Sequence, residues 1–381
     1  MEIGDFVKVE ANEAEAVFLS TRTILQILKQ NGTTIPKGIT RDYPLSDIRG
    51  FMLDVGRKPT SLDFLYDIMK LMSWYKMNDF QVHLNDNYIW VTEYGAEAIE
   101  KAYAGFRLES NDIGANGVPL TSTDISYTKA EFGEFIDKSK LYGVNIVPEI
   151  ESPAHALSFM KAHPEFAYGK GDHKGVGENA AMLDVTNPEV VEYIKGIFSE
   201  YTDGENPVFR DTKVHIGADE FYGNSEEYRA YTDEMLKYIR DEKGRTPRVW
   251  GSLSNKRGNT PVTAEGIEMN IWNNGWADPS DMFNAGYDLI NTEDGKLYIV
   301  PDAGYYYDYL NTNYIYNNYE VSKFGNGDVI PAGSPQMRGG MFAVWNDMID
   351  RKANGIVELD IYDRVLPDVQ VLSEKMWGLA E

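Results

Sequence analysis

From about residue 49 onward, the chain alternates short apolar segments, typical of strands, with longer segments whose apolar residues have helical spacing. Helices are expected near 61–76, 128–142, 154–162, 188–202, 224–243 and 367–377. Strands are expected at 50–55, 79–84, 144–148, 213–218, 248–250, 267–272, 287–291 and 340–345. Eight strands that alternate with helices predict an α/β fold of the closed (β/α)8 type, the TIM barrel. An open doubly wound sheet is the alternative, but no Gly-x-Gly-x-x-Gly follows the first strand.

The first 48 residues do not fit this alternation, so we divide the chain into an N-terminal segment, 1–48, and a barrel, 49–381. The N-terminal segment contains a predicted helix over 22–29 that ends at Asn31-Gly32, because glycine readily terminates a helix. A single helix cannot bury its apolar face alone. We therefore expect this helix to pack on the barrel or to belong to a further domain.

Composition limits the possible partners and chemistry. The net charge of -24 argues against nucleic acid or an anionic membrane as a partner, because both are bound by patches of Lys and Arg. No stretch approaches the roughly 18 consecutive apolar residues of a membrane span, and the first residues lack the pattern of a signal peptide. The absence of cysteine excludes thiolate chemistry, and with only 5 scattered histidines we expect no metal site and no cofactor.

The segment from His215 to Glu220 ends a predicted strand with two adjacent acids, Asp219 and Glu220. Consecutive side chains of a strand point to opposite faces. Both carboxylates can therefore face one pocket only if the chain leaves strand geometry there, as it does at the C-terminal mouth of a β/α barrel. Paired acids at such a mouth suit cleavage of a glycosidic bond, which needs a proton donor and a stabiliser of positive charge. Solvated acids at a strand end are the alternative.

Polar and aromatic side chains also follow the other predicted strands. They are Arg57, then Asn85, Asp86 and Asn87, then Glu149, Glu151 and His155, then Trp250, Trp272, Trp345 and Asp347. At a barrel rim such residues indicate a ligand site. Singly, each has an ordinary interpretation: Arg57 can equally serve as an ion-pair partner of Asp54 or Asp86, and a tryptophan is more often core than ligand platform.

Four segments taken together resemble glycoside hydrolase family 20, which contains β-N-acetylhexosaminidases and lacto-N-biosidases. These segments are 49–57, 83–87, 148–156 and 215–220, and the resemblance runs from about residue 20 to the end of the chain. Residues 17–44 resemble the end of the small α/β domain that precedes the barrel in this family, so 1–48 is interpreted as the C-terminal remnant of that domain. The resemblance also implies a bacterial, extracellular or cell-surface location.

The resemblance implies a retaining exo-glycosidase with substrate-assisted catalysis, in which the 2-acetamido oxygen of the sugar attacks the anomeric carbon and forms an oxazolinium intermediate. Glu220 would protonate the leaving oxygen and then deprotonate water, so a raised pKa is expected of it. Asp219 would hold the acetamido N–H and offset the developing charge. Tyr298 matches the position of a tyrosine that donates to the acetamido oxygen.

The resemblance also implies a binding site for an oligosaccharide or glycoconjugate. Trp250, Trp272 and Trp345 would form an apolar wall around the acetamido methyl group and under the ring. Arg57 would bind ring hydroxyls as a fixed donor fork. His155 and Asp86 would orient the catalytic groups, although a buried structural histidine fits His155 equally well.

Three departures bear on specificity. Val300 stands where many family members carry an acid, and Trp345-Asn346-Asp347 stands where they carry Trp-x-Glu, so Asp347 is one methylene shorter. The run 85–87, the segment 272–276 and the tyrosines 305–307, with Tyr306 as a substrate-binding candidate, look closer to the lacto-N-biosidase branch. In that branch the pocket takes a galactosyl-β-1,3-N-acetylglucosamine disaccharide. A packed lid fits the tyrosines equally well.

The sequence therefore predicts an enzyme that releases terminal β-linked N-acetylhexosamine, with a lacto-N-biosidase as the alternative. A catalytically silent glycan-binding barrel is the alternative of another class, but such a barrel usually lacks the acid pair, and Asp219, Glu220 and Tyr298 are all present. The oligomeric state is left open by the sequence.

Overall fold

The computed structural model describes residues 1–168, 181–331, 333–348 and 356–379. Within them, eight parallel strands close into a barrel, because the last strand pairs with both its predecessor and the first. The strands are β5 (Ile48–Asp54), β6 (Asp79–His83), β9 (Asn145–Ser152), β10 (Val214–Gly217), β11 (Pro247–Trp250), β12 (Glu268–Ile271), β13 (Asp288–Asn291) and β15 (Met337–Val344). The predicted (β/α)8 barrel is confirmed and the open sheet is excluded.

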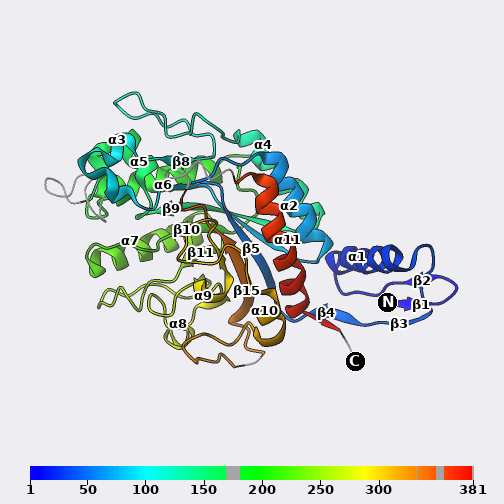
Figure 1. The fold of residues 1–381 in the computed structure, drawn as a ribbon. Helices are drawn as coiled ribbons and strands as arrows, with labels where there is room; N and C mark the ends of the chain where they lie inside the picture. The colour runs from blue at the N-terminus through cyan, green and yellow to red at the C-terminus, as the bar shows by residue number, and fades with distance from the viewer. Residues whose placement is uncertain (169–180, 332, 349–355, 380–381) are drawn as a thin grey trace.

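Helices cover the outside of the barrel, and Figure 1 shows α2 and α11 lying side by side against β5. The longer helices are α2 (Leu62–Trp74), α4 (Lys129–Leu141), α6 (Pro188–Thr202), α7 (Ser225–Lys237) and α11 (Glu358–Lys375). The shorter ones are α3 (Ala98–Lys101), α5 (Leu157–Ala162), α8 (Pro279–Ala285), α9 (Asp294–Leu297) and α10 (Thr312–Asn318). Side-chain caps explain two starts: Ser61 accepts from the N–H of Phe64, and Thr128 forms a capping box with Glu131.

Two helices of the barrel differ from the sequence prediction, and the helix predicted over 22–29 begins earlier, at Ala14. Helix α11 begins at Glu358, well before the predicted start at Pro367. The prediction was wrong because proline favours the first turn of a helix, whereas here Pro367 lies inside one. The predicted helix over 224–243 is divided into α7 and a π-helical turn, η4 (Tyr238–Glu242).

Short elements surround the mouth of the barrel and connect its strands. The strand pair β7 (Asn85–Asn87) and β8 (Ala104–Phe106) encloses η1 (Val91–Glu97), which lies in the region predicted to be a loop-rich insertion. The turn η2 (Pro164–Phe166) follows α5, and β14 (Tyr298–Ile299) pairs with β15.

The N-terminal segment forms a small sheet and a helix of its own. Strands β1 (Glu2–Ile3), β2 (Val7–Lys8) and β3 (Gly38–Ile39) pair antiparallel, and α1 (Ala14–Asn31) ends at Gly32, as expected. Figure 1 shows these elements beside the barrel. Gln26 of α1 donates to the carbonyl of Trp74 at 2.8 Å, and β4 (Asp42–Pro44) pairs with β16 (Trp377–Leu379). Interpretation of 1–48 as a domain remnant stays a prediction.

None of the described helices is long and apolar enough to span a membrane.

Candidate active site

A cavity of about 510 Å³ opens at the carboxyl ends of the barrel strands. It is lined by ten of the eleven candidate site residues, namely Arg57, Asp86, His155, Asp219, Glu220, Trp272, Tyr298, Tyr306, Trp345 and Asp347. The remaining candidate, Trp250, lies beneath the floor with 1% of its surface exposed. Its indole N–H donates to Glu149 Oε1 at 2.6 Å, and its ring packs 5.6 Å from that of Trp345. The expectation that Trp250 walls the pocket is therefore corrected: it supports Trp345 from below.

The chain leaves strand geometry immediately after β10, as the adjacent acids require. Gly217, Ala218 and Glu220 have φ angles of 75°, 80° and 45°, in the left-handed region. This turn brings the side chains of Asp219 and Glu220 to the same cavity. Glycine is needed at 217 because a Cβ atom there would overlap the carboxyl group of Glu151.

His155 links Glu220 to the buried acid Asp86. Its Nε2 lies 3.2 Å from Glu220 Oε2, and its Nδ1 lies 3.1 Å from Asp86 Oδ1. Burial alone would lower the pKa of His155, but the carboxylates of Asp86 and Asp219 outweigh burial and hold this pKa well above its ordinary value. The raised pKa favours the protonated form of His155 beside Glu220, and the choice between an orienting and a structural role for His155 stays a prediction.

The two adjacent acids titrate in opposite directions. Burial and the charge of Glu220 raise the pKa of Asp219 to about 6, although His155 opposes them. Burial also acts to raise the pKa of Glu220, but the hydrogen bond and the charge of His155 outweigh it and lower this pKa. The expected raised pKa of Glu220 is thus wrong for this arrangement, because the protonated imidazole favours the ionised carboxylate.

Arg57 is engaged by three carboxylates at once. Its guanidinium lies 3.1 Å from Asp54, 3.0 Å from Asp86 and 3.4 Å from Asp347, and its Nε donates to the carbonyl of Asn87 at 2.7 Å. Burial would lower the pKa of Arg57, but these carboxylates outweigh it and raise the pKa. Both ion pairs expected from the sequence are present, and a third is added. Arg57 therefore fixes the carboxylates at the rim, and its expected contact with ring hydroxyls of a sugar stays a prediction.

The closure of the barrel lies directly beside this cluster. The backbone N–H of Asn346, which follows β15, donates to Asp54 Oδ2 at 3.0 Å, and its side chain donates to the carbonyl of Asp54 at 2.6 Å. Asp54 ends β5. These contacts, with those from Arg57 to Asp54 and Asp347, join the first and last strands; we call them the seam of the barrel.

Aromatic side chains form one wall of the cavity. The ring of Tyr298 lies 5.8 Å from Trp345 and 5.6 Å from Tyr306. Burial and the charges of Asp294 and Asp219 raise the pKa of Tyr298 well above its ordinary value, so its hydroxyl remains a donor at neutral pH. The hydroxyl of Tyr306 donates to Asp294 at 2.8 Å, which fixes Tyr306 at the cavity.

Three aromatic residues that line the cavity were missed by the sequence analysis or left unassigned. Tyr305 donates to Asp347 Oδ2 at 2.6 Å, and Trp90 packs edge-on against it with ring centroids 6.0 Å apart. Tyr222, two residues after Glu220, also lines the cavity. Their position shortly after the predicted strand ends, close in sequence to Asp86, Glu220 and Tyr298, was the signal that could have identified them.

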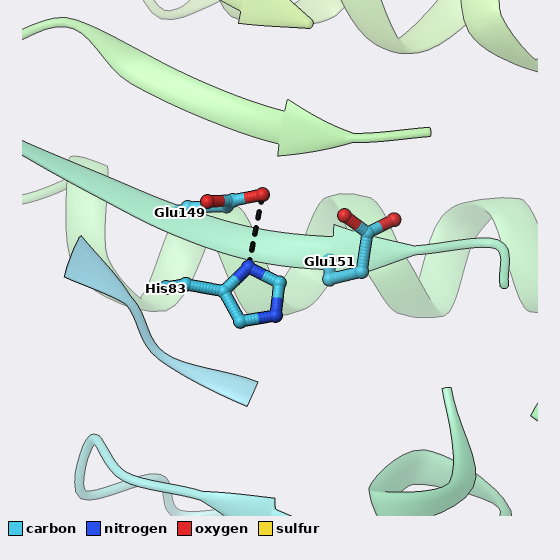
Figure 2. A group of neighbouring side chains, drawn as sticks. All are labelled: His83, Glu149 and Glu151. Carbon is cyan, nitrogen blue, oxygen red and sulfur yellow. Dashed lines mark ion pairs between the residues drawn. The ribbon is translucent and has the colours of Figure 1, made fainter. Parts of the chain in front are cut away.

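A network of buried charges includes His83, which lines the cavity, and extends into the barrel to Glu149 and Glu151. Figure 2 shows His83 of β6 turned toward Glu149 of β9, with Glu151 two residues farther along the same strand. His83 pairs with Glu149 at 3.0 Å and with Asp86 at 2.7 Å. Burial lowers the pKa of His83, but Glu149 and Asp86 outweigh it and raise the pKa to about 10.

Among the residues that the structure describes, two groups of side chains bring possible metal-ligand atoms within 4.8 Å of one another. One comprises His83, Glu149 and Glu151, and the other comprises His155, Asp219 and Glu220. In the first group, Glu149 Oε1 accepts from Trp250 and Oε2 accepts from Gln81 at 2.8 Å. Both carboxylate oxygens of Glu149 are therefore already occupied by hydrogen bonds from protein side chains. The expected lack of a metal site stays a prediction.

Comparisons with known proteins agree with this geometry. Residues 47–230 match the family model "Glycosyl hydrolase family 20, catalytic domain". A lacto-N-biosidase of Bifidobacterium bifidum is 24% identical over 386 residues, which cover 95% of this chain and 31% of that protein. A β-hexosaminidase of Akkermansia muciniphila is 26% identical over 291 residues, covering 70% and 56%. This chain thus spans less than two thirds of the length of these relatives.

Solved structures of similar fold include hexosaminidases. A β-N-acetylhexosaminidase from Bacteroides fragilis has a TM-score of 0.70 at 20% identity, covering 98% of this chain and 75% of that one. An exo β-N-acetylglucosaminidase from Vibrio harveyi, in complex with N-acetylglucosamine, also has a TM-score of 0.70 at 20% identity, covering 99% and 62%. At this identity, the likeness shows a shared fold.

Proposed function

Because this chain is a glycoside hydrolase of family 20, with the match to the catalytic domain over residues 47–230, we propose that it releases terminal β-linked N-acetylhexosamine from oligosaccharides or glycoconjugates. One observation carries the proposal. Asp219 and Glu220 are adjacent in sequence, yet both line one cavity with Tyr298 and the aromatic wall. An extracellular or cell-surface location stays a prediction from the family resemblance.

Glu220 supplies the proton in the proposed mechanism. Its carboxyl proton goes to the glycosidic oxygen as the bond from that oxygen to the anomeric carbon breaks, while the acetamido oxygen bonds to the same carbon. A water then attacks the anomeric carbon, Glu220 takes the proton of the water, and the bond to the acetamido oxygen breaks. A sugar that covers Glu220 removes water from it, which raises its pKa. We therefore expect Glu220 to gain its proton as the sugar binds.

Asp219 and Tyr298 act on the acetamido group. The Asp219 carboxylate accepts the acetamido N–H and offsets the positive charge of the oxazolinium, and the Tyr298 hydroxyl donates to the acetamido oxygen. Supporting these roles, Tyr298 keeps its proton at neutral pH, and Asp219 ionises above pH 6, where its pKa lies. Trp272 and Trp345 line the cavity and offer apolar surface to the acetamido methyl group.

Lacto-N-biosidase activity is the second candidate function, and the residues around Asp347 at the rim of the cavity support it. Asp347 is held between Arg57 and Tyr305, one methylene shorter than the glutamate of many family members. The cavity is also lined by the stretch 89–92, which includes Trp90. A second sugar would find hydrogen-bonding groups and an aromatic face there. The similarity to a lacto-N-biosidase over 95% of the chain supports this candidate.

The test is release of a chromogenic leaving group from β-N-acetylglucosaminide, β-N-acetylgalactosaminide and β-lacto-N-bioside, with Glu220→Gln as the matched control. Cleavage of the monosaccharides supports the hexosaminidase, and cleavage of the disaccharide alone supports the biosidase. No turnover of any substrate by the folded wild type would contradict the proposal and favour the silent barrel. Substrate assistance predicts slower turnover when the acetamido group is trifluoroacetylated, because its oxygen is then a weaker nucleophile.

A further inference from the structure

Glu151, near the end of β9, supports the turn that carries the catalytic acids, although it does not line the cavity. It is fully buried, and its Oε1 accepts the backbone N–H of Ala218 at 2.8 Å. Its carboxyl group also lies against the Cα of Gly217, where a Cβ would overlap it. One side chain thus contacts both residues that precede Asp219 in the left-handed turn.

The carboxyl group of Glu151 can act as a fixed support because its own backbone is held. Asn85 accepts from the N–H of Glu151 at 2.8 Å and donates to its carbonyl at 2.9 Å. On the opposite side of the turn, the carbonyl of Ala218 accepts from the hydroxyl of Tyr228 at 2.6 Å. Ala218 is therefore held at its N–H by Glu151 and at its carbonyl by Tyr228.

The charges around Glu151 favour its neutral form. His83 and Glu149 each bring a side-chain atom within 4.8 Å of the Glu151 carboxyl group. The carboxylates of Asp219, Glu149 and Asp86 all oppose a further negative charge on Glu151. The titratable groups that interact with Glu151 are Asp219, Glu149, Asp86, Tyr228 and Tyr231.

Hydrogen bonding favours the same form. Oε2 of Glu151 has no hydrogen-bond partner among the residues that the structure describes. A buried carboxylate with one hydrogen bond is far costlier than a buried carboxylic acid. Burial and the charges of Asp219 and Glu149 accordingly raise the pKa of Glu151 well above its ordinary value.

We propose that Glu151 is a positioning residue, an uncharged carboxylic acid that holds the N–H of Ala218 and thereby directs Asp219 and Glu220 into the cavity. The length of the side chain matters, because aspartate is about 1.5 Å shorter and would not reach Ala218. The consequence for catalysis rests on the proposed function, whereas the proton on Glu151 and its hold on Ala218 do not.

The kinetic test compares three substitutions of Glu151 with wild type. Glu151→Gln keeps the acceptor and the neutral charge, so kcat should stay within about threefold of wild type, and the pH profile of kcat/KM should be unchanged. Glu151→Asp and Glu151→Met lose the contact with Ala218. Their kcat should fall about a hundredfold, with a smaller change in KM, since displacement by about 1 Å has effects of that size.

Infrared difference spectroscopy tests the proton directly. Wild type minus Glu151→Gln at pH 7 should show the carbonyl band of a protonated carboxylic acid. The control Glu149→Gln, on the same strand, should remove a carboxylate band instead, because Glu149 accepts from Trp250 and Gln81. The absence of the acid band in the first difference would overturn the neutral form.

Hydrogen exchange tests the positioning without turnover. The Ala218 amide should exchange faster in Glu151→Met than in wild type, and at the wild-type rate in Glu151→Gln. Wild-type kcat and unchanged exchange in Glu151→Met would overturn the positioning role. If kcat falls as far in Glu151→Gln as in Glu151→Met, and the acid limb of the pH profile of kcat/KM shifts, then the negative charge of an ionised Glu151 is required and the neutral form is overturned. If wild type cleaves no substrate, the proposed function fails, while infrared and exchange still decide this proposal.

Discussion

Replacement of Asp368 by asparagine should make the stability of the protein less dependent on pH. Asp368 lies in α11 with 1% of its surface exposed, and neither carboxyl oxygen has a hydrogen-bond partner in the described part of the chain. Burial raises its pKa from 3.8 to about 8. Because the carboxyl group ionises near pH 4 in the unfolded chain but only near pH 8 in the folded protein, a rise in pH between these values favours the unfolded chain. The free energy of unfolding therefore decreases over this range.

The size of this effect follows from the pKa. Between pH 5 and pH 8, Asp368 is ionised in the unfolded chain but protonated when folded, which costs about 1.4 kcal/mol for each pH unit. Asp368→Asn should therefore gain roughly 3.5 kcal/mol of stability at pH 8 relative to pH 5, slightly less than three full pH units because folded Asp368 is half ionised at pH 8. The buried amide adds its own cost, about 1–3 kcal/mol, but this cost is the same at both pH values and cancels in the comparison.

The assay is urea denaturation of wild type and variant at pH 5 and pH 8, after refolding has been shown to be reversible. Asp363→Asn is the matched control, because Asp363 lies on the same helix but is exposed. Its effect should be equal at both pH values. An equal effect of Asp368→Asn at pH 5 and pH 8 would refute the reasoning and show that this carboxylate has a partner or reaches water.

Other predictions concern the cavity and its turn. Since the pKa of Asp219 is raised to about 6, and the ionised form is required, kcat/KM should fall as pH drops below about 6; a flat profile down to pH 5 would contradict its role. Gly217→Ala should destabilise by roughly 2 kcal/mol or more in thermal unfolding, because φ is 75° and a Cβ would meet the buried acid beneath it. Ala218→Gly, at φ 80°, should be neutral or stabilising. Tyr305→Phe removes the hydrogen bond to Asp347 and should raise KM about tenfold at unchanged kcat; a fall in kcat alone would contradict this.

Much of the fold was predictable because its signals are local. Each barrel strand is a short apolar run, and the caps at Ser61 and Thr128 mark helix starts that depend only on neighbouring residues. The start of α11 was not predicted, because Pro367 is a first-turn residue by preference and only the packed helix shows it in the interior. Local preference was overridden there by the apolar face that α11 buries.

The sequence predicted which residues belong to the site, but not their pKa values or their exact positions around the cavity. The acids after β10 indicated paired carboxylates, and the structure brings both to one cavity. The lowered pKa of Glu220 depends on His155, 65 residues earlier, and on Asp86, which holds the charge of His155. Likewise, Trp250 was expected in the pocket but lies under it, since its indole N–H binds Glu149. The pKa of Glu220 and the position of Trp250 both depend on contacts between segments far apart in the sequence, which the spacing of residues does not predict.

The seam has a consequence for biosynthesis. Asp54 is made early and Asp347 near the end, yet Arg57 joins them, and Asn346 binds Asp54. A growing chain on the ribosome therefore holds both adjacent acids, Asp219 and Glu220, long before it holds a complete pocket. Proteins of this size fold as they are synthesised from the N-terminus. The chain should consequently lack its pocket, and with it the proposed activity, until the last barrel strand has left the exit tunnel.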